Sequence, residues 1–112
     1  MNQLDATLAA LAEPTRRRVI ELLRERPRRA TDLAAEAGAS GPAMSRHLRV
    51  LRGSGLVEEQ RVDHDARVHV YRLRPEPFVT LQAWLDDVHA FWTDQLDAYR
   101  AHVERTRGGS HP

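Results

Sequence analysis

The apolar residues of this sequence recur at helical spacing in several separate stretches, and one stretch carries more information than the others. It runs from Ser40 to Gly53. Its apolar positions are Met44, His47, Leu48 and Leu51. They follow the i, i+3, i+4, i+7 pattern of a helix with one buried side. Ser40 can cap the start of this helix, Pro42 suits its first turn, and Gly53 or Gly55 favours its end. The pattern predicts one helix with an apolar stripe facing a core.

The opposite face of this predicted helix is made of small, polar and positively charged residues. It comprises Gly41, Pro42, Ser45, Arg46, Arg49 and Arg52. Small residues at a helix start let the backbone approach a DNA duplex closely, and Arg46 can reach base edges or phosphates. The same residues also fit an ordinary solvated helix surface, so this stretch alone leaves both interpretations open.

The flanking stretches favour DNA binding. Before the helix, residues 31–38 read as a short helix that Thr31 caps and Gly38 ends, so a turn of about three to four residues joins the two helices. After it, residues 56–62 and 67–73 are strand-like around a charged tip at 63–66. These elements predict a mainly α fold with a small β-hairpin (α+β), a winged helix-turn-helix. Arg61, Arg67 and Arg72 of the wing can reach DNA phosphates or a minor groove.

Two further helices are predicted toward the N-terminus. Leu4, Leu8 and Leu11 lie at i, i+4 and i+7, which gives a short helix whose apolar edge needs a partner. That partner is either the core of the same chain or a second chain. Pro14 begins the next helix, which ends before Pro27.

A long helix over residues 78–105 is the second informative feature. Its apolar residues recur at spacings of three and four and include five of the six aromatic residues of the chain. The candidate interface residues are Leu81, Trp84, Leu85, Val88, Phe91, Trp92 and Tyr99. So broad an apolar face favours a homodimer interface, with burial in the monomer or a pocket for an aromatic effector as alternatives. Residues 106–112 are polar and rich in glycine, and we expect a disordered tail there.

Composition narrows the picture in three ways. The chain has 112 residues, 41% hydrophobic and 29% charged, which fits one small globular domain. Residues 1–74 carry 14 arginines against 10 acids, a net +4, whereas residues 75–112 carry 3 against 6, a net −3. The positive charge therefore falls in the half that contains the helix-turn-helix, as non-specific DNA binding requires. The absence of long apolar runs and of a signal-peptide pattern predicts a cytoplasmic protein with no membrane partner.

Several blocks between Leu8 and Phe91 together resemble the ArsR/SmtB family of winged-helix repressors. They are AEPTRR at 12–17, TDLA at 31–34, SRHLRVL at 45–51, GLV at 55–57 and VYRL at 70–73. The blocks occur in the family's order, and the combination is far more specific than any single block.

This resemblance implies a homodimeric repressor that binds an inverted repeat in promoter DNA. The expected organisation is a single domain over 1–105, with an N-terminal dimer helix (1–13), a DNA-binding core (14–74) that includes the wing (56–73), and a C-terminal dimer helix (78–105). The residues expected at DNA are Ser40, Gly41, Pro42, Ser45, Arg46, Arg49, Arg61 and Arg67. The N-terminal Leu4, Leu8 and Leu11 join the dimer seam in this interpretation.

The metal sites of the family are not expected in this chain. The positions at which some relatives carry thiolates are Arg29 and Thr31 here, and the chain has no cysteine. Asp87 and His89 match the opening of a second family site, whose later ligand positions are Arg100 and Val103 here. We therefore expect no metal, no cofactor, no catalytic residue and no enzymatic activity. An organic effector bound at the aromatic helix, or a winged helix that binds another protein, are the remaining alternatives.

Overall fold

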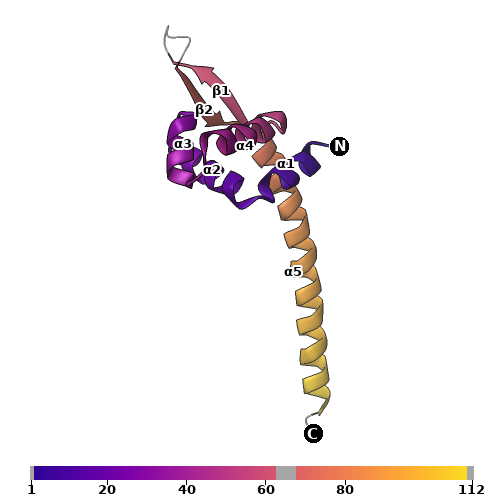
Figure 1. Cartoon of the computed structure of the whole chain (residues 1–112). Coiled ribbons are helices and arrows are strands. Elements are labelled where there is room, and N and C mark those ends of the chain that lie inside the picture. Colours follow the sequence, from indigo (N-terminus) through magenta and orange to yellow (C-terminus); the bar gives the residue numbers. More distant parts are fainter. Residues whose placement is uncertain (1, 63–67, 111–112) are drawn as a thin grey trace. The chain divides into compact units, whose positions relative to one another are not determined.

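The computed structural model describes residues 2–62 and 68–110, and within these it contains five helices and two strands (Figure 1). In chain order they are α1 (Gln3–Leu11), α2 (Pro14–Glu25), α3 (Ala30–Ala37), α4 (Gly41–Gly53), β1 (Val57–Arg61), β2 (His69–Leu73) and α5 (Glu76–Ser110). All seven correspond to predicted elements, so the sequence patterns identified the secondary structure correctly. Differences occur at some boundaries. Among the described residues, no helix combines the length and apolarity that a membrane crossing needs.

The chain divides into two compact units, Met1–Thr80 and Leu81–Pro112. The first unit holds α1 to α4, both strands and the start of α5, and the second holds the rest of α5. The expectation of one domain over residues 1–105 stays a prediction.

The core of the first unit is built from the apolar stripes of its helices. α4 contributes Met44, Leu48 and Leu51, and each is at most 2% exposed. α2 contributes Val19, Ile20, Leu22 and Leu23, α3 contributes Leu33, and Leu56 and Val57 follow from the start of the hairpin. The stripe predicted for α4 is therefore buried, with His47 only half-buried at its edge.

Local capping explains where α4 begins and where α3 ends. The Ser40 hydroxyl accepts a hydrogen bond from the Ala43 amide at 3.2 Å, as expected of an N-cap. Gly38 ends α3 with a φ of 67°, a left-handed conformation that glycine adopts without steric cost. Three residues, 38–40, then join α3 to α4, which is the spacing of a helix-turn-helix.

The prediction that Thr31 caps α3 is wrong. The helix begins at Ala30, and Arg29, two residues before Thr31, is its N-cap without a side-chain hydrogen bond. The reason lies in the preceding residue, because Arg28 pairs with Tyr71 as an isolated β-bridge. The Arg28 amide donates to the Tyr71 carbonyl at 3.1 Å, and the Tyr71 amide donates back at 2.8 Å. This bridge holds the chain extended up to the first turn of α3.

β1 and β2 form an antiparallel pair in which Val57 faces Leu73 and Arg61 faces His69. The hairpin follows α4 directly, as predicted for a wing. Arg67 and the charged tip at 63–66 lie outside the described residues, so the contacts of Arg67 stay a prediction.

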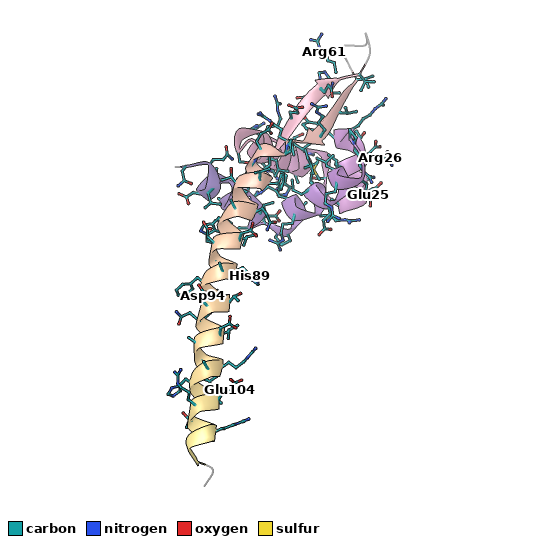
Figure 2. All side chains as sticks on the ribbon, turned by 180° about the vertical axis from the view of Figure 1, so that it is seen from behind. Glu25, Arg26, Arg61, His89, Asp94 and Glu104 are labelled. Atoms are coloured by element: carbon teal, nitrogen blue, oxygen red, sulfur yellow. The ribbon has the colours of Figure 1, made fainter. Side chains whose placement is uncertain are left out.

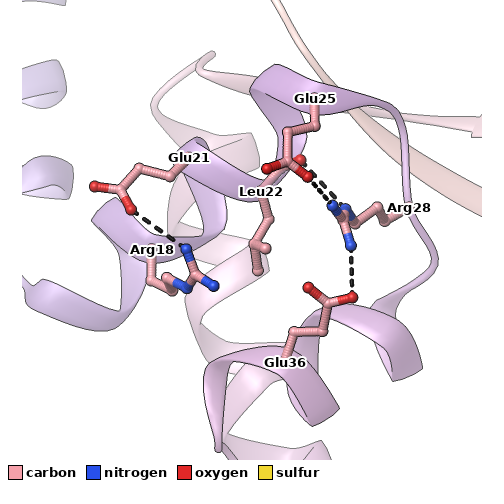
Figure 3. A network of polar contacts seen from close by, with 6 residues as sticks. All are labelled: Arg18, Glu21, Leu22, Glu25, Arg28 and Glu36. Carbon is pink, nitrogen blue, oxygen red and sulfur yellow. Dashed lines mark hydrogen bonds and ion pairs between the residues drawn. The ribbon is translucent and has the colours of Figure 1, made fainter.

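A polar network around the Arg28 side chain joins α2 to α3 (Figure 3). The Arg28 side chain is only 4% exposed, and its guanidinium contacts Glu25 at 2.5 Å and Glu36 at 2.6 Å. Its Nε also donates to the carbonyl of Leu22 at 3.2 Å. Two carboxylates and one carbonyl thus compensate the buried positive charge of the Arg28 guanidinium. This charge also keeps some contact with water.

α5 is longer at both ends than the sequence predicts. It begins at Glu76 because Pro77 fits the first turn of a helix, where its missing amide hydrogen is not needed. It continues to Ser110, so residues 106–110 are helical and the expected disordered tail is wrong for them. The Thr106 hydroxyl donates to the His102 carbonyl at 2.9 Å within this last part. Residues 111–112 lie outside the described part of the chain.

We expect Arg28→Met to lower the free energy of unfolding by about 2 kcal/mol, because hydrogen bonds to a charged group are lost and the Leu22 carbonyl is left without this donor. The matched control is Arg26→Met, since Arg26 is exposed and makes no ion pair within the described residues. That control should change the unfolding free energy by less than about 0.5 kcal/mol. Equal values for both variants in urea unfolding would show that the network adds nothing.

Candidate nucleic-acid interface

The residues predicted to read DNA lie together on one face of α4. Gly41, Pro42, Ser45, Arg46 and Arg49 are all exposed, whereas the opposite face of the same helix is packed in the core. Neither Arg46 nor Arg49 makes an ion pair within residues 2–62 and 68–110. These two guanidinium groups are therefore available to an external anion. Ser40 is also exposed, and its hydroxyl oxygen serves the start of the helix.

The back of α4 is held by a polar cluster centred on His47. The His47 Nδ1 atom lies 3.5 Å from Arg16 Nη1 and 3.8 Å from a Glu13 carboxylate oxygen. Glu13 caps α2, and the hydrogen bond from the Arg16 amide lowers the pKa of its carboxyl below the ordinary value. Partial burial opposes this shift, and His47 reinforces it. The charged cap is therefore favoured at neutral pH, and the cluster fixes α4 against the start of α2.

Arg16 and Arg17, in the first turn of α2, close the end of α1. Arg16 Nε donates to the Ala10 carbonyl at 2.6 Å, and Arg17 Nη1 donates to the Leu11 carbonyl at 2.7 Å. The last carbonyls of a helix have no partner within the helix itself. A pair of arginines just after a predicted helix end is the signal that could have indicated this role.

The arginines of the wing differ in their availability. Arg72 pairs with Glu58, and Arg52 at the end of α4 pairs with Glu59 at 2.9 Å, so carboxylates balance both charges. Arg61 is exposed at the far end of β1 and makes no ion pair with any described residue (Figure 2). Of the wing arginines that the structure describes, Arg61 is thus the better candidate for a phosphate contact.

Glu59 connects α4 to the hairpin. It accepts from Arg52 and lies 2.9 Å from His69 Nδ1. Burial raises the pKa of the neighbouring Tyr71 phenol, and the negative charge of Glu59 raises it further. Tyr71 therefore remains a neutral hydrogen-bonding group at physiological pH.

The second candidate surface is the apolar face of α5. Trp84, Leu85, Phe91, Trp92 and Tyr99 are all more than 40% exposed, with Tyr99 at 68%. Phe91 and Trp92 meet edge to face, with ring centroids 5.8 Å apart. Leu81 and Val88 are half-buried. An exposed apolar face this large is characteristic of an interaction site.

The N-terminal candidates for the dimer seam are less exposed. Leu4 and Leu11 are half-buried, and Leu8 is 39% exposed. Leu11 packs against the core of the first unit. Their part in a dimer stays a prediction.

No group of three histidine, cysteine, aspartate or glutamate side chains that could hold a metal ion occurs in the described part of the chain. Arg29, Thr31, Asp87 and His89 are each exposed. That the chain binds no metal stays a prediction.

Comparisons with known proteins agree with one another. The model of the bacterial regulatory protein, arsR family, matches residues 13–59. The HTH-type transcriptional regulator Rv2034 of Mycobacterium tuberculosis is 38% identical over 96 residues, which cover 85% of this chain and 83% of the relative. The crystal structure of an ArsR family transcriptional regulator, RHA00566, superposes with a TM-score of 0.73 at 30% identity, covering 82% of this chain and 98% of that one.

Another solved structure bears on assembly. The solution structure of a homodimeric winged helix-turn-helix DNA-binding domain from Mycobacterium bovis, a possible ArsR-family regulator, has a TM-score of 0.62 at 26% identity. The match covers 83% of this chain and 83% of the M. bovis domain.

We expect Arg49→Gln and Arg61→Gln each to reduce the salt dependence of duplex binding, because a lost phosphate contact releases about one counterion fewer per chain. The slope of log K against log salt concentration should fall by about one for each bound chain in each variant. Arg24→Gln is the matched control, since Arg24 is exposed on α2 and its replacement changes the net charge equally. A slope that falls as much in the control would show that only net charge matters.

Proposed function

This chain belongs to the ArsR family of bacterial regulatory proteins, and on that premise we propose that it is a sequence-specific DNA-binding regulator that acts as a homodimeric repressor. The observation that carries the proposal is the two-sided α4. One face is packed in the core, and the other presents small residues, a hydroxyl and two arginines that make no ion pair with any described residue.

In this proposal α4 is the recognition helix and lies in the major groove. Gly41 and Pro42 allow close approach of the backbone, and Ser45 and Arg46 contact base edges. An arginine suits this role because its planar guanidinium can bond to guanine O6 and N7 at once. Arg49 and Arg61 hold phosphates, which orients the helix without reading sequence. Arg67 is proposed for the same task, although it lies outside the described residues.

A homodimer is supported by the exposed apolar face of α5 and by the homodimeric M. bovis relative. We propose that Trp84, Phe91 and Trp92 are its anchors, because large aromatic side chains dominate the energy of protein interfaces. A two-fold axis would place the two recognition helices about 34 Å apart, in successive major grooves. The operator would then be an imperfect inverted repeat.

Repression follows if the operator overlaps a promoter, because the bound dimer and RNA polymerase then compete for the same DNA. Nothing in this mechanism needs a chemical step. The residues act only by binding, positioning and excluding the polymerase.

The direct test compares binding of the protein to the DNA upstream of its own coding sequence with binding to scrambled DNA. We expect the upstream fragment to bind at least about a thousandfold more tightly, with two chains per site. Arg46→Ala should weaken binding to this fragment by about 1 to 3 kcal/mol and binding to scrambled DNA by much less.

Arg24→Ala, which removes an exposed arginine from α2, should leave the preference for the upstream fragment intact. Equal losses on the two DNAs for Arg46→Ala would show that Arg46 touches only phosphate. Equal affinity of the unaltered protein for both DNAs would contradict the proposed function.

A further inference from the structure

An open hollow of about 350 Å³ lies between α3 and the start of α4. Its lining residues are Ala30, Thr31, Ala34, Gly41, Met44 and Ser45. The methyl groups of two alanines and a threonine, together with the Met44 side chain, make this lining largely apolar. The hollow shares Gly41 and Ser45 with the face of α4 proposed to contact DNA. It is therefore an apolar recess within a surface that is otherwise polar and positively charged.

Nothing within the described protein requires a glycine at position 41. Its backbone is not in the left-handed region, since Gly38 and Gly55 are the described glycines with positive φ. A Cβ added at Gly41 would meet no atom within 4 Å. Alanine would also lose less backbone entropy than glycine on entering a helix. The fold thus accepts a side chain here at no steric cost, so the space beside Gly41 is open to a binding partner.

The charge around the hollow indicates what that partner is. Arg46 and Arg49 follow on the same helix, exposed and without ion pairs among the described residues, and they complement a polyanion. Ser45 and Thr31, which line the hollow and are exposed, carry hydroxyls that suit polar base edges or phosphate oxygens. Thymine is the one DNA base that presents a methyl group in the major groove.

Resting on the proposed function, we propose that the hollow receives the 5-methyl group of a thymine in each operator half-site, and that Gly41 keeps the hollow open for it. The methyl group packs against Ala34 and the Thr31 methyl while Arg46 contacts a neighbouring base. Gly41, Thr31 and Ala34 are then residues that determine specificity for a thymine through shape and apolar contact.

The test replaces each operator thymine by uracil, which removes only the methyl group, and measures the affinity of the unaltered protein. Replacing the contacted thymine in one half-site should lower the affinity about fourfold. This is the usual contribution of one buried methyl group. Changing both half-sites together should give about fifteenfold. Thymines outside the contact should show no change.

The same series with Gly41→Ala tests the role of the glycine. This variant should unfold at the same temperature as the unaltered protein or above it, yet bind the thymine operator about fifteenfold more weakly, because both chains of the dimer lose the methyl contact. Its preference for thymine over uracil should fall from about fourfold to near one, because the added methyl group occupies the hollow. Gly53→Ala is the matched control, since a Cβ there also meets no atom within 4 Å at the other end of α4. That variant should keep the fourfold preference.

The outcomes separate the two proposals. A protein that prefers its operator but is insensitive to every uracil substitution overturns this inference alone, and that result would also be expected if the hollow served a small-molecule effector. A Gly41→Ala variant that keeps the thymine preference overturns it as well. A protein without any operator preference overturns the proposed function and this inference with it.

Discussion

The burial of the apolar stripe of α4 is the constraint on which the rest of the structure depends. Met44, Leu48 and Leu51 are almost fully buried, and they fix the rotation of the helix about its own axis. Because side chains on a helix keep a constant angular spacing, burying these three necessarily turns Ser45, Arg46 and Arg49 outward. One hydrophobic contact thus supplies both stability and the orientation of the proposed recognition surface. Truncating a buried leucine typically costs about 2–5 kcal/mol, so the stripe outweighs any single polar contact around it.

Polar contacts add to the apolar core in holding the helices and the hairpin in position. Arg28 holds α3 and the hairpin to α2, while His47 and Glu13 hold the back of α4 to the start of α2. Carboxylates also neutralise Arg52 and Arg72, whereas Arg46, Arg49 and Arg61 remain without ion pairs in the described chain. The difference matters because an arginine without an internal partner can bind a phosphate without first breaking an ion pair.

Local patterns were enough to predict α4, its Ser40 cap and the Gly38 turn, because spacing and capping are properties of neighbouring residues. The start of α3 could not be predicted in the same way, since the distant Tyr71 decides it through the β-bridge to Arg28. Nothing local marks Arg28 as buried, because its carboxylate partners come from two different helices. The end of α5 was misplaced because glycines lower helix propensity without forbidding a helix. Among the candidate DNA contacts, the exposure of α4 followed from its periodicity, whereas the pairing of Arg72 required knowledge of the hairpin register.

The central claim is that the outward face of α4 enters the major groove in two copies. A cysteine introduced at Val50, which is 43% exposed on α4, would be the only cysteine of the chain and could carry a DNA-cleaving iron chelate. Two clusters of cleavage are expected in the upstream fragment, centred about 34 Å apart. The same chelate on a cysteine at Arg24 of α2 should leave these positions intact. A single cluster would contradict the dimer, and equal or unlocalised cleavage from both positions would contradict the placement of α4 in the groove.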